Sequence, residues 1–161
     1  MKKLILLFIA TTVFAQNSTQ KVNFVLDNWH KAAAEVHFED YMNAMTNDAV
    51  YIGTDANENW TKTQFMAFAK PYFDKGKAWN FSVIERHVYL SKDKKMAWFD
   101  ELLNTQMKIC RGSGVLVKRD KDWKIQHYVL SMTVPNEKTL EVIKIKSIIE
   151  DKIIDNKSTN K

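Results

Sequence analysis

Residues 95–118 read KMAWFDELLNTQMKICRGSGVLVK, and they indicate the fold more clearly than any other part of the chain. They contain two runs rich in β-branched and aromatic residues on either side of TQM (105–107), which is typical of a hairpin turn. Similar runs precede and follow this pair, again separated by short polar turns. The sequence therefore predicts a four-strand antiparallel meander, with strands at 79–90, 95–105, 108–118 and 122–134.

The part of the chain before the meander has helical periodicity. Apolar residues recur every three or four positions on one face of 20–35, which predicts a helix. A second short helix is predicted from Phe38, and a strand is predicted at 49–53. His30 lies next to Lys31 on the first helix, so we expect the His30 side chain to face solvent.

Two further helices are predicted, one on each side of the meander. Thr61 and Gln64 have the spacing of a capping box, which predicts a helix that begins there and runs to about Asp74. Aliphatic residues at helical spacing predict a last helix over 136–156. A chain in which helices come first and a meander follows belongs to the α+β class.

The N-terminus has the features of a signal peptide. Met1-Lys2-Lys3 is positively charged, and Leu4 to Phe14 is an apolar stretch too short to span a membrane. Val13-Phe14-Ala15 matches the small-x-small rule for a cleavage site. We expect residues 1–15 to be removed after Ala15 and the protein to be exported from a bacterial cell, to the periplasm or as a secreted protein.

The rest of the chain has the size of one domain. We expect 16–135 to fold as this domain and 136–161 to form an amphipathic helix with a short tail. The formal net charge of +5 falls to about +3 without Lys2 and Lys3. There is neither a basic stripe nor a nucleic-acid motif, and no later segment is apolar enough to cross a bilayer. We expect no nucleic-acid partner and no membrane span.

The residue types that hold metals or disulfides are sparse. Cys110 is the only cysteine, so no internal disulfide can form. The histidines have no ligand-pair spacing, with each other or with Cys110, and we expect no metal site. Gly112-x-Gly114 lies inside a strand with no helix after it, so it is not a phosphate loop. We expect no cofactor.

The predicted meander places several polar residues on one face. Hairpin turns that are each centred on a single residue place Glu101 opposite Arg111, and Ser113 opposite His127. Together with Ser131, these residues form the polar end of a face that is otherwise apolar. We expect this face to look into a binding site.

Asp100 falls on the other face with Trp98, because neighbouring residues in a strand alternate between faces. Gly112 and Gly114 leave room opposite these two residues. This second face is also largely apolar, and a sheet with two apolar faces is usually covered on both. The helices cover one face, and we expect a second copy of the chain to cover the other in a homodimer.

Three interpretations of Glu101 remain open: a binding role, in which it orients the polar end of a ligand, a catalytic role and a structural role. In the catalytic one, burial raises the pKa of the Glu101 carboxyl so that it acts as a general base, and His127 carries the proton. In the structural one, the charge of Arg111 lowers the pKa of Glu101 and holds it ionised. Asp100 is the other candidate acid, and its alternative role is a charge at the rim or the dimer interface.

Aromatic residues are predicted to form the mouth of a pocket. Tyr51, Trp60 and Phe65 are candidates, with Trp60 as a lid after the polar loop 54–59, and Phe99 is an apolar contact further in. The alternative is ordinary packing of a helix start onto the sheet.

These patterns together resemble the SnoaL-like domain of the nuclear transport factor 2-like superfamily over residues 20–135. The residues that carry the resemblance are Tyr51-Ile52-Gly53-Thr54-Asp55, Glu58-Asn59-Trp60, Ala97-Trp98-Phe99-Asp100-Glu101, Arg111-Gly112-Ser113-Gly114-Val115-Leu116, Trp123-Lys124-Ile125-Gln126-His127-Tyr128 and Ser131. The resemblance implies a cone-shaped fold, in which N-terminal helices pack on a strongly bent antiparallel sheet around a deep pocket. It also implies frequent dimers, and members that include polyketide cyclases, isomerases, dehydratases and proteins that only bind.

Three functions follow as hypotheses. The first is an exported domain that binds a small, largely apolar molecule in the cone, with its polar end held by the polar residues of the sheet. The second is an acid–base enzyme of the isomerase, cyclase or dehydratase type that uses Glu101 or Asp100 with His127. The third is a dimeric interaction module whose cone is filled by Trp98, Trp123 and Phe99.

Overall fold

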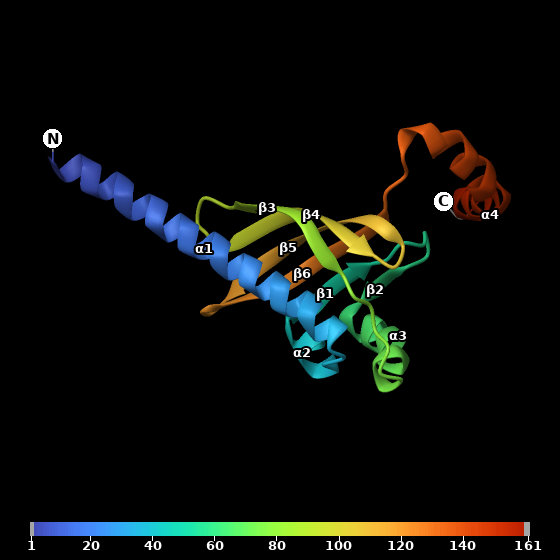
Figure 1. Cartoon of the computed structure of the whole chain (residues 1–161), viewed down its shortest axis with the longest axis horizontal. Helices are drawn as coiled ribbons and strands as arrows, with labels where there is room; N and C mark the ends of the chain where they lie inside the picture. Colours follow the sequence, from blue (N-terminus) through green and yellow to red (C-terminus); the bar gives the residue numbers. More distant parts are fainter. Residues whose placement is uncertain (1, 160–161) are drawn as a thin grey trace.

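The computed structural model describes the backbone of residues 2–159 and the side chains of residues 18–158. Three helices lie against a strongly curved six-stranded sheet, and a fourth helix projects from one end of it (Figure 1). The helices are α1 (Lys2–Ala34), α2 (Phe38–Asn43), α3 (Lys62–Asp74) and α4 (Thr139–Thr159). This arrangement confirms the α+β class, the bent sheet and the additional C-terminal helix.

The sheet contains the predicted meander, a strand over most of the predicted 49–53 and one further short strand. Its strands are β1 (Met45–Ile52), β2 (Asn59–Thr61), β3 (Ser82–Leu90), β4 (Met96–Thr105), β5 (Lys108–Arg119) and β6 (Asp122–Met132). Their order is β2-β1-β6-β5-β4-β3, and β1 pairs with β6 in parallel while the other pairs are antiparallel. The β3–β6 meander is confirmed, and β1 and then β2 extend the sheet beyond β6.

Some helix and strand boundaries differ from those predicted. Helix α1 begins at Lys2, and the side chains of the predicted signal peptide lie outside the described residues. Strand β1 begins four residues earlier than predicted, and the polar loop ends in β2, which is too short for its pattern to be recognised. The capping box is confirmed, because Thr61 Oγ1 accepts from the Gln64 N–H and Gln64 Oε1 accepts from the Thr61 N–H.

The predicted strand registers are wrong by one or two residues. Glu101 pairs with Gly112, and His127 pairs with Val115. Thr105 pairs with Lys108 in the first hairpin, and the second hairpin also has a two-residue turn. The centre of each turn therefore lies between two residues. A register shift in the β5–β6 pair moves the second half of β6 by a further residue.

Aromatic rings fill much of the space between the helices and the sheet. Trp29 on α1 stacks on Tyr41 with ring centroids 4.9 Å apart, and Tyr51 stacks on Phe65 at 3.8 Å. Phe99 and Trp123 are also buried, as a filled cone requires, but Trp98 lies on the outer face and is 43% exposed. Within the described part of the chain, no helix is long and apolar enough to cross a membrane.

Candidate functional site

Glu101 lies at the centre of a buried polar cluster. Strand β4 alternates buried and more exposed residues, and Glu101 falls on the buried face, where it is 1% exposed. Its Oε1 accepts hydrogen bonds from His30 Nε2 at 2.9 Å and from the Tyr128 hydroxyl at 3.2 Å. Its Oε2 accepts from Arg86 Nε at 2.8 Å. Three donors from α1, β3 and β6 therefore surround one carboxylate.

Arg86 extends this cluster to the surface of α1. Its side chain is 6% exposed, and its Nη1 donates to Asp27 Oδ1 at 2.6 Å. Asn23, Asp27 and His30 lie on one face of α1, which therefore binds the sheet through polar as well as apolar contacts. The cluster joins the N-terminal helix to strands β3, β4 and β6 of the sheet.

The electrostatics of the cluster favour an ionised carboxylate. Burial raises the pKa of Glu101, but the hydrogen bond and charge of His30 and the guanidinium of Arg86 outweigh burial and lower the pKa. Burial and the adjacent charge of Glu101 raise the pKa of Tyr128, so its hydroxyl remains a donor. A carboxylate held ionised by three donors is suited to structural stabilisation and poorly suited to accepting a proton.

Gly112 makes room for this arrangement. A Cβ at this position would lie 2.4 Å from the Tyr128 hydroxyl and 2.8 Å from Glu101 Oε1. The prediction that Gly112 makes room opposite Asp100 is wrong, because its actual partner across the strands is Glu101. Gly114 likewise lies opposite Phe99 and not opposite Trp98.

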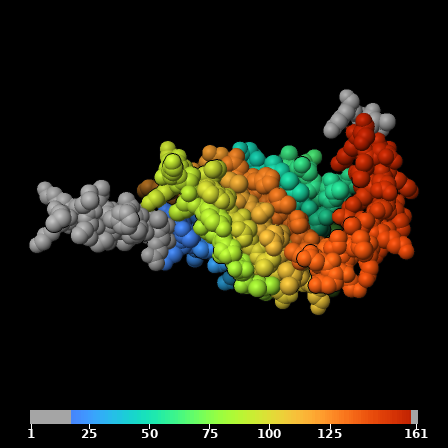
Figure 2. Space-filling model, turned by 90° about the horizontal axis from the view of Figure 1, so that it is seen from above, coloured from blue at the N-terminus to red at the C-terminus, as the bar shows by residue number. Residues whose placement is uncertain are grey.

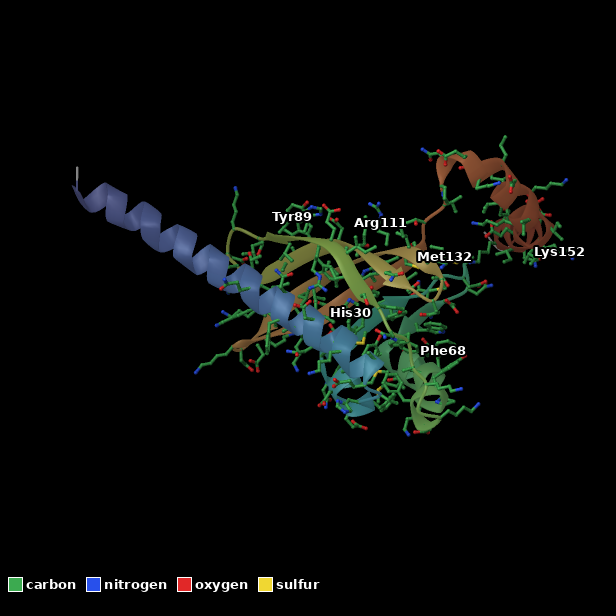
Figure 3. All side chains as sticks on the ribbon, viewed as in Figure 1. His30, Phe68, Tyr89, Arg111, Met132 and Lys152 are labelled. Carbon is green, nitrogen blue, oxygen red and sulfur yellow. The ribbon has the colours of Figure 1, made fainter. Side chains whose placement is uncertain are left out.

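The residues predicted to surround Glu101 lie on the outer face of the sheet. Arg111, Ser113, His127 and Ser131 all face away from the buried cluster, because the registers differ from those predicted. Figure 3 shows Arg111 on the side of the sheet away from α1. The predicted pairing of Glu101 with Arg111 and its proximity to His127 are therefore wrong.

Asp100 also lies on the outer face, as predicted. Its Oδ2 is 3.0 Å from His87 Nδ1, and both side chains are about half exposed. The hydrogen bond to Asp100 raises the pKa of His87. Asp100 is therefore a surface ion-pair partner in a place that cannot cooperate with Glu101.

The sequence hypothesis missed His30 and Arg86. His30 is 5% exposed, so the prediction that it faces solvent is wrong. It follows Val22 and Leu26 at intervals of four residues, which places it on the buried face of α1, and this spacing was the available signal. Arg86 shares the inner face of β3 with Val88 and Leu90, but only the tertiary fold brings it to Glu101.

A small cavity lies at the predicted aromatic mouth. Its volume is about 130 Å³, and Tyr51, Trp60 and Phe65 line it, together with Trp79, Phe81 and Leu130. The Tyr51, Trp60 and Phe65 rings are stacked on one another. The structure therefore brings three of the predicted binding residues together, whereas Phe99 is packed deeper, against Tyr128.

One layer of rings separates this cavity from the Glu101 cluster. Phe81 lines the cavity and meets the His30 ring edge-on at 5.9 Å. Tyr51 also lines it and lies 5.4 Å from the Tyr128 ring. A molecule in the cavity would contact the groups that cover the cluster, and it would not contact the Glu101 carboxylate itself.

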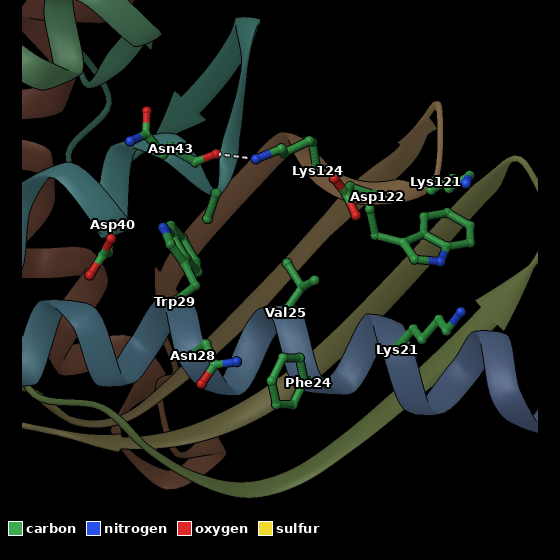
Figure 4. Close-up of a pocket in the computed structure, with 12 residues that line it drawn as sticks. Lys21, Phe24, Val25, Asn28, Trp29, Asp40, Asn43, Lys121, Asp122 and Lys124 are labelled. Carbon is green, nitrogen blue, oxygen red and sulfur yellow. Dashed lines mark hydrogen bonds between the residues drawn. The ribbon is translucent and has the colours of Figure 1, made fainter.

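A second cavity lies at the other end of β6. It has a volume of about 420 Å³ between α1, α2 and the β5–β6 turn (Figure 4). Phe24, Trp29 and Trp123 line it, and Lys124 Nζ donates to the Asn43 carbonyl at 2.6 Å beside it. None of the predicted site residues lines this cavity.

Comparison with known proteins agrees with the fold. The family model of the SnoaL-like domain matches residues 22–135 of this chain. The chain therefore belongs to this family. No curated protein matches it.

Solved structures of the nuclear transport factor 2-like superfamily resemble it at low identity. A protein of unknown function from Pseudomonas putida is 12% identical, with a TM-score of 0.62 over 73% of this chain and 88% of its own. A suspected dehydratase from Streptomyces avermitilis is 10% identical, with a TM-score of 0.65 over 75% and 99%. A suspected scytalone dehydratase from Novosphingobium aromaticivorans is 11% identical, with a TM-score of 0.65 over 76% and 89%. At these identities the similarity establishes the fold alone.

Proposed function

We propose that this SnoaL-like domain binds a small, largely apolar molecule at the aromatic mouth of the cone. The observation that carries the proposal is the cavity between β1, α3 and the segment before β3, which stacked aromatic rings line. Aromatic walls with a few polar groups are typical of small-molecule sites. Trp60 lies at the rim, where it is half-buried.

The size and polarity of the cavity define the ligand class. An apolar cavity of about 150 Å³ accepts a benzene-sized molecule, and this one measures about 130 Å³. Glu58 and Gln106 also line it, and both carry side-chain oxygens that accept hydrogen bonds. We infer a single-ring compound, or an apolar compound of similar size, with one hydroxyl or amino donor.

Binding of benzyl alcohol tests this proposal. Titration by saturation-transfer NMR should give a dissociation constant that rises roughly tenfold in Trp60→Ala, since one aromatic contact contributes about 1 kcal/mol or more. Trp98→Ala is the matched control, because it removes an indole from the outer face. Equal affinity in the two variants, or no binding by the parent, would contradict the proposal and favour a filled cone.

The acid–base enzyme is a weaker candidate. Glu101 and His127 lie on opposite faces of the sheet, and the Glu101 carboxylate already accepts three hydrogen bonds. The dehydratase descriptions of the two structural neighbours concern those proteins. Catalysis by Glu101 would require Tyr51 and Phe81 to move aside first.

We also propose a homodimer through the outer face of the sheet. Tyr89 and Trp98 stack there with ring centroids 5.7 Å apart, and they are 46% and 43% exposed. Figure 3 shows Tyr89 on the side of the sheet away from α1. In sedimentation velocity, Trp98→Asp should weaken this dimer. Phe24→Asp replaces an exposed aromatic residue on α1 in the same way and should not weaken it. Equal effects of the two changes would argue against this interface.

We also propose that the protein is exported. The apolar stretch and cleavage rule at the N-terminus support removal of residues 1–15. Protein purified from the medium or periplasm of a bacterial host should begin at Gln16 on N-terminal sequencing. A chain that stays in the cytoplasm with Met1 intact would contradict export.

A further inference from the structure

Helix α4 exposes more aliphatic surface than an isolated helix in water is expected to keep. It projects from the end of the sheet after the segment that follows β6 (Figures 1 and 2). Its large apolar side chains are mostly solvent-exposed: Leu140, Ile143, Ile145, Ile148, Ile149 and Ile154. An apolar surface of this extent normally marks an interaction site.

The sequence of α4 contains a continuous aliphatic stripe. Val142, Ile145, Ile149 and Ile153 follow one another at intervals of three, four and four residues, which places them on one side of the helix. Ile149 is the middle residue of Thr139–Thr159. This spacing is the one that pairs two helices along a common seam.

The charges of α4 indicate what covers the stripe. The N-terminal half has one excess positive charge from Glu141, Lys144 and Lys146. The C-terminal half has one excess negative charge from its acidic and basic residues, which are Glu150, Asp151, Lys152, Asp155 and Lys157. A neutral helix has no net attraction to anionic lipid. An antiparallel copy of the same helix, by contrast, places each half beside the opposite charge and opposes the two helix dipoles.

We propose that α4 is a dimerisation arm, which packs antiparallel against α4 of a second copy of this chain with Ile149 at the centre of the seam. The pairing is isologous, so each copy buries the same aliphatic stripe. It uses residues outside the sheet face and outside the aromatic mouth. It therefore stands or falls independently of the ligand and of the sheet-face dimer proposed above.

Engineered cysteines test the direction of the pairing. Antiparallel packing about Ile149 brings Ile149→Cys against its own copy, and it keeps the two Val142→Cys thiols more than a helical turn apart. Mild oxidation should therefore cross-link Ile149→Cys and leave Val142→Cys uncross-linked. Cys110 is buried and does not compete. Cross-linking of both variants would indicate parallel packing, and cross-linking of neither would indicate no pairing, so each result would overturn the proposal.

Self-association of the full chain provides the second test. In the Trp98→Asp background, which removes the sheet-face contact, sedimentation equilibrium should show a dimer that Ile149→Asp weakens by roughly 30-fold or more. Ser147→Asp adds the same charge to the opposite side of α4 and should leave the dimer intact. Equal effects of the two changes would contradict the proposal. A monomer that instead binds neutral phosphatidylcholine vesicles through α4 would also contradict it, because the stripe would then contact lipid.

Discussion

Glu101 connects three parts of the molecule through one buried side chain. Its carboxylate accepts hydrogen bonds from His30 on α1, Arg86 on β3 and Tyr128 on β6. Ionised groups are costly to bury unless they are paired and hydrogen-bonded, and the Glu101 carboxylate meets that condition at both of its oxygens. Gly112 completes the cluster by leaving space beside it.

Substitution of Glu101 should destabilise the domain strongly. Glu101→Gln removes the charge that pairs with buried Arg86 and His30, and breaking a buried pair in this way costs about 3 kcal/mol or more of the free energy of unfolding. Asp100→Asn, the matched change at the exposed neighbour, should cost less than about 1 kcal/mol. Urea denaturation followed by circular dichroism measures both values, and similar losses would contradict the structural role of Glu101.

The same carboxylate should make stability depend on pH in the acid range. The pKa of Glu101 is lowered in the folded protein, so its contribution is fully present above the ordinary glutamate pKa of about 4.3 and is lost as the pH falls through the folded value. Between pH 6 and pH 3, the parent should therefore lose more unfolding free energy than Glu101→Gln. Parallel losses in the two proteins would show that other carboxylates account for the acid sensitivity.

For single residues, the sequence predicts which side chains face inward more accurately than it predicts their partners. The alternation along 97–103 predicts that Glu101 looks into the cone and Asp100 looks out, and both side chains lie as predicted. The partners Arg86 and His30 come from segments far away in the chain. No local spacing can identify such partners, because the fold itself creates the contact.

Helix α3 shows how a local motif determines an element. Thr61 and Gln64 satisfy each other's backbone N–H groups at its N-terminus, and Gly76, with φ of 67°, lies just beyond its C-terminus. The helix positions Phe65 beside Tyr51 at the aromatic mouth. Because both signals lie within a few residues of the helix ends, the sequence predicts this element well.

Loss of the cap should therefore weaken the domain measurably. Thr61→Ala removes the side-chain oxygen that accepts from Gln64 and should lower the free energy of unfolding by about 1 kcal/mol. Thr63→Ala, an exposed threonine in the first turn of the same helix, should have little effect or stabilise slightly. Thermal or urea unfolding distinguishes them, and an equal effect would mean that the capping box contributes little.

The register of the meander shows the limit of local signals. A shift of one residue moves every side chain to the other face of a strand. The two-residue turns and the register shift in β6 together place Arg111 and His127 outside, although the strands themselves are where the sequence predicts them. Register depends on turn geometry and on packing between strands, which the pattern of one strand does not encode.

The whole molecule is a bent sheet with a polar cluster inside and an aromatic cavity at its mouth. The cluster stabilises the joint between α1 and the sheet, and the rings of Tyr51 and Phe81 separate it from the cavity. This division separates a stabilising cluster in the interior from the ligand site that we propose at the mouth. The larger cavity between α1 and β6 shares Trp29 with the core and offers a competing place for a ligand.

The most direct test of the account is to observe where a small aromatic ligand binds. Benzyl alcohol titrated into protein labelled with ¹⁵N at its tryptophan indoles should shift the Trp60 and Trp79 N–H resonances, which belong to the mouth cavity, and leave Trp123 and Trp98 unchanged. A shift at Trp123 alone would place the ligand in the cavity between α1 and β6 and would contradict the account. An unchanged spectrum at saturating ligand would contradict it as well.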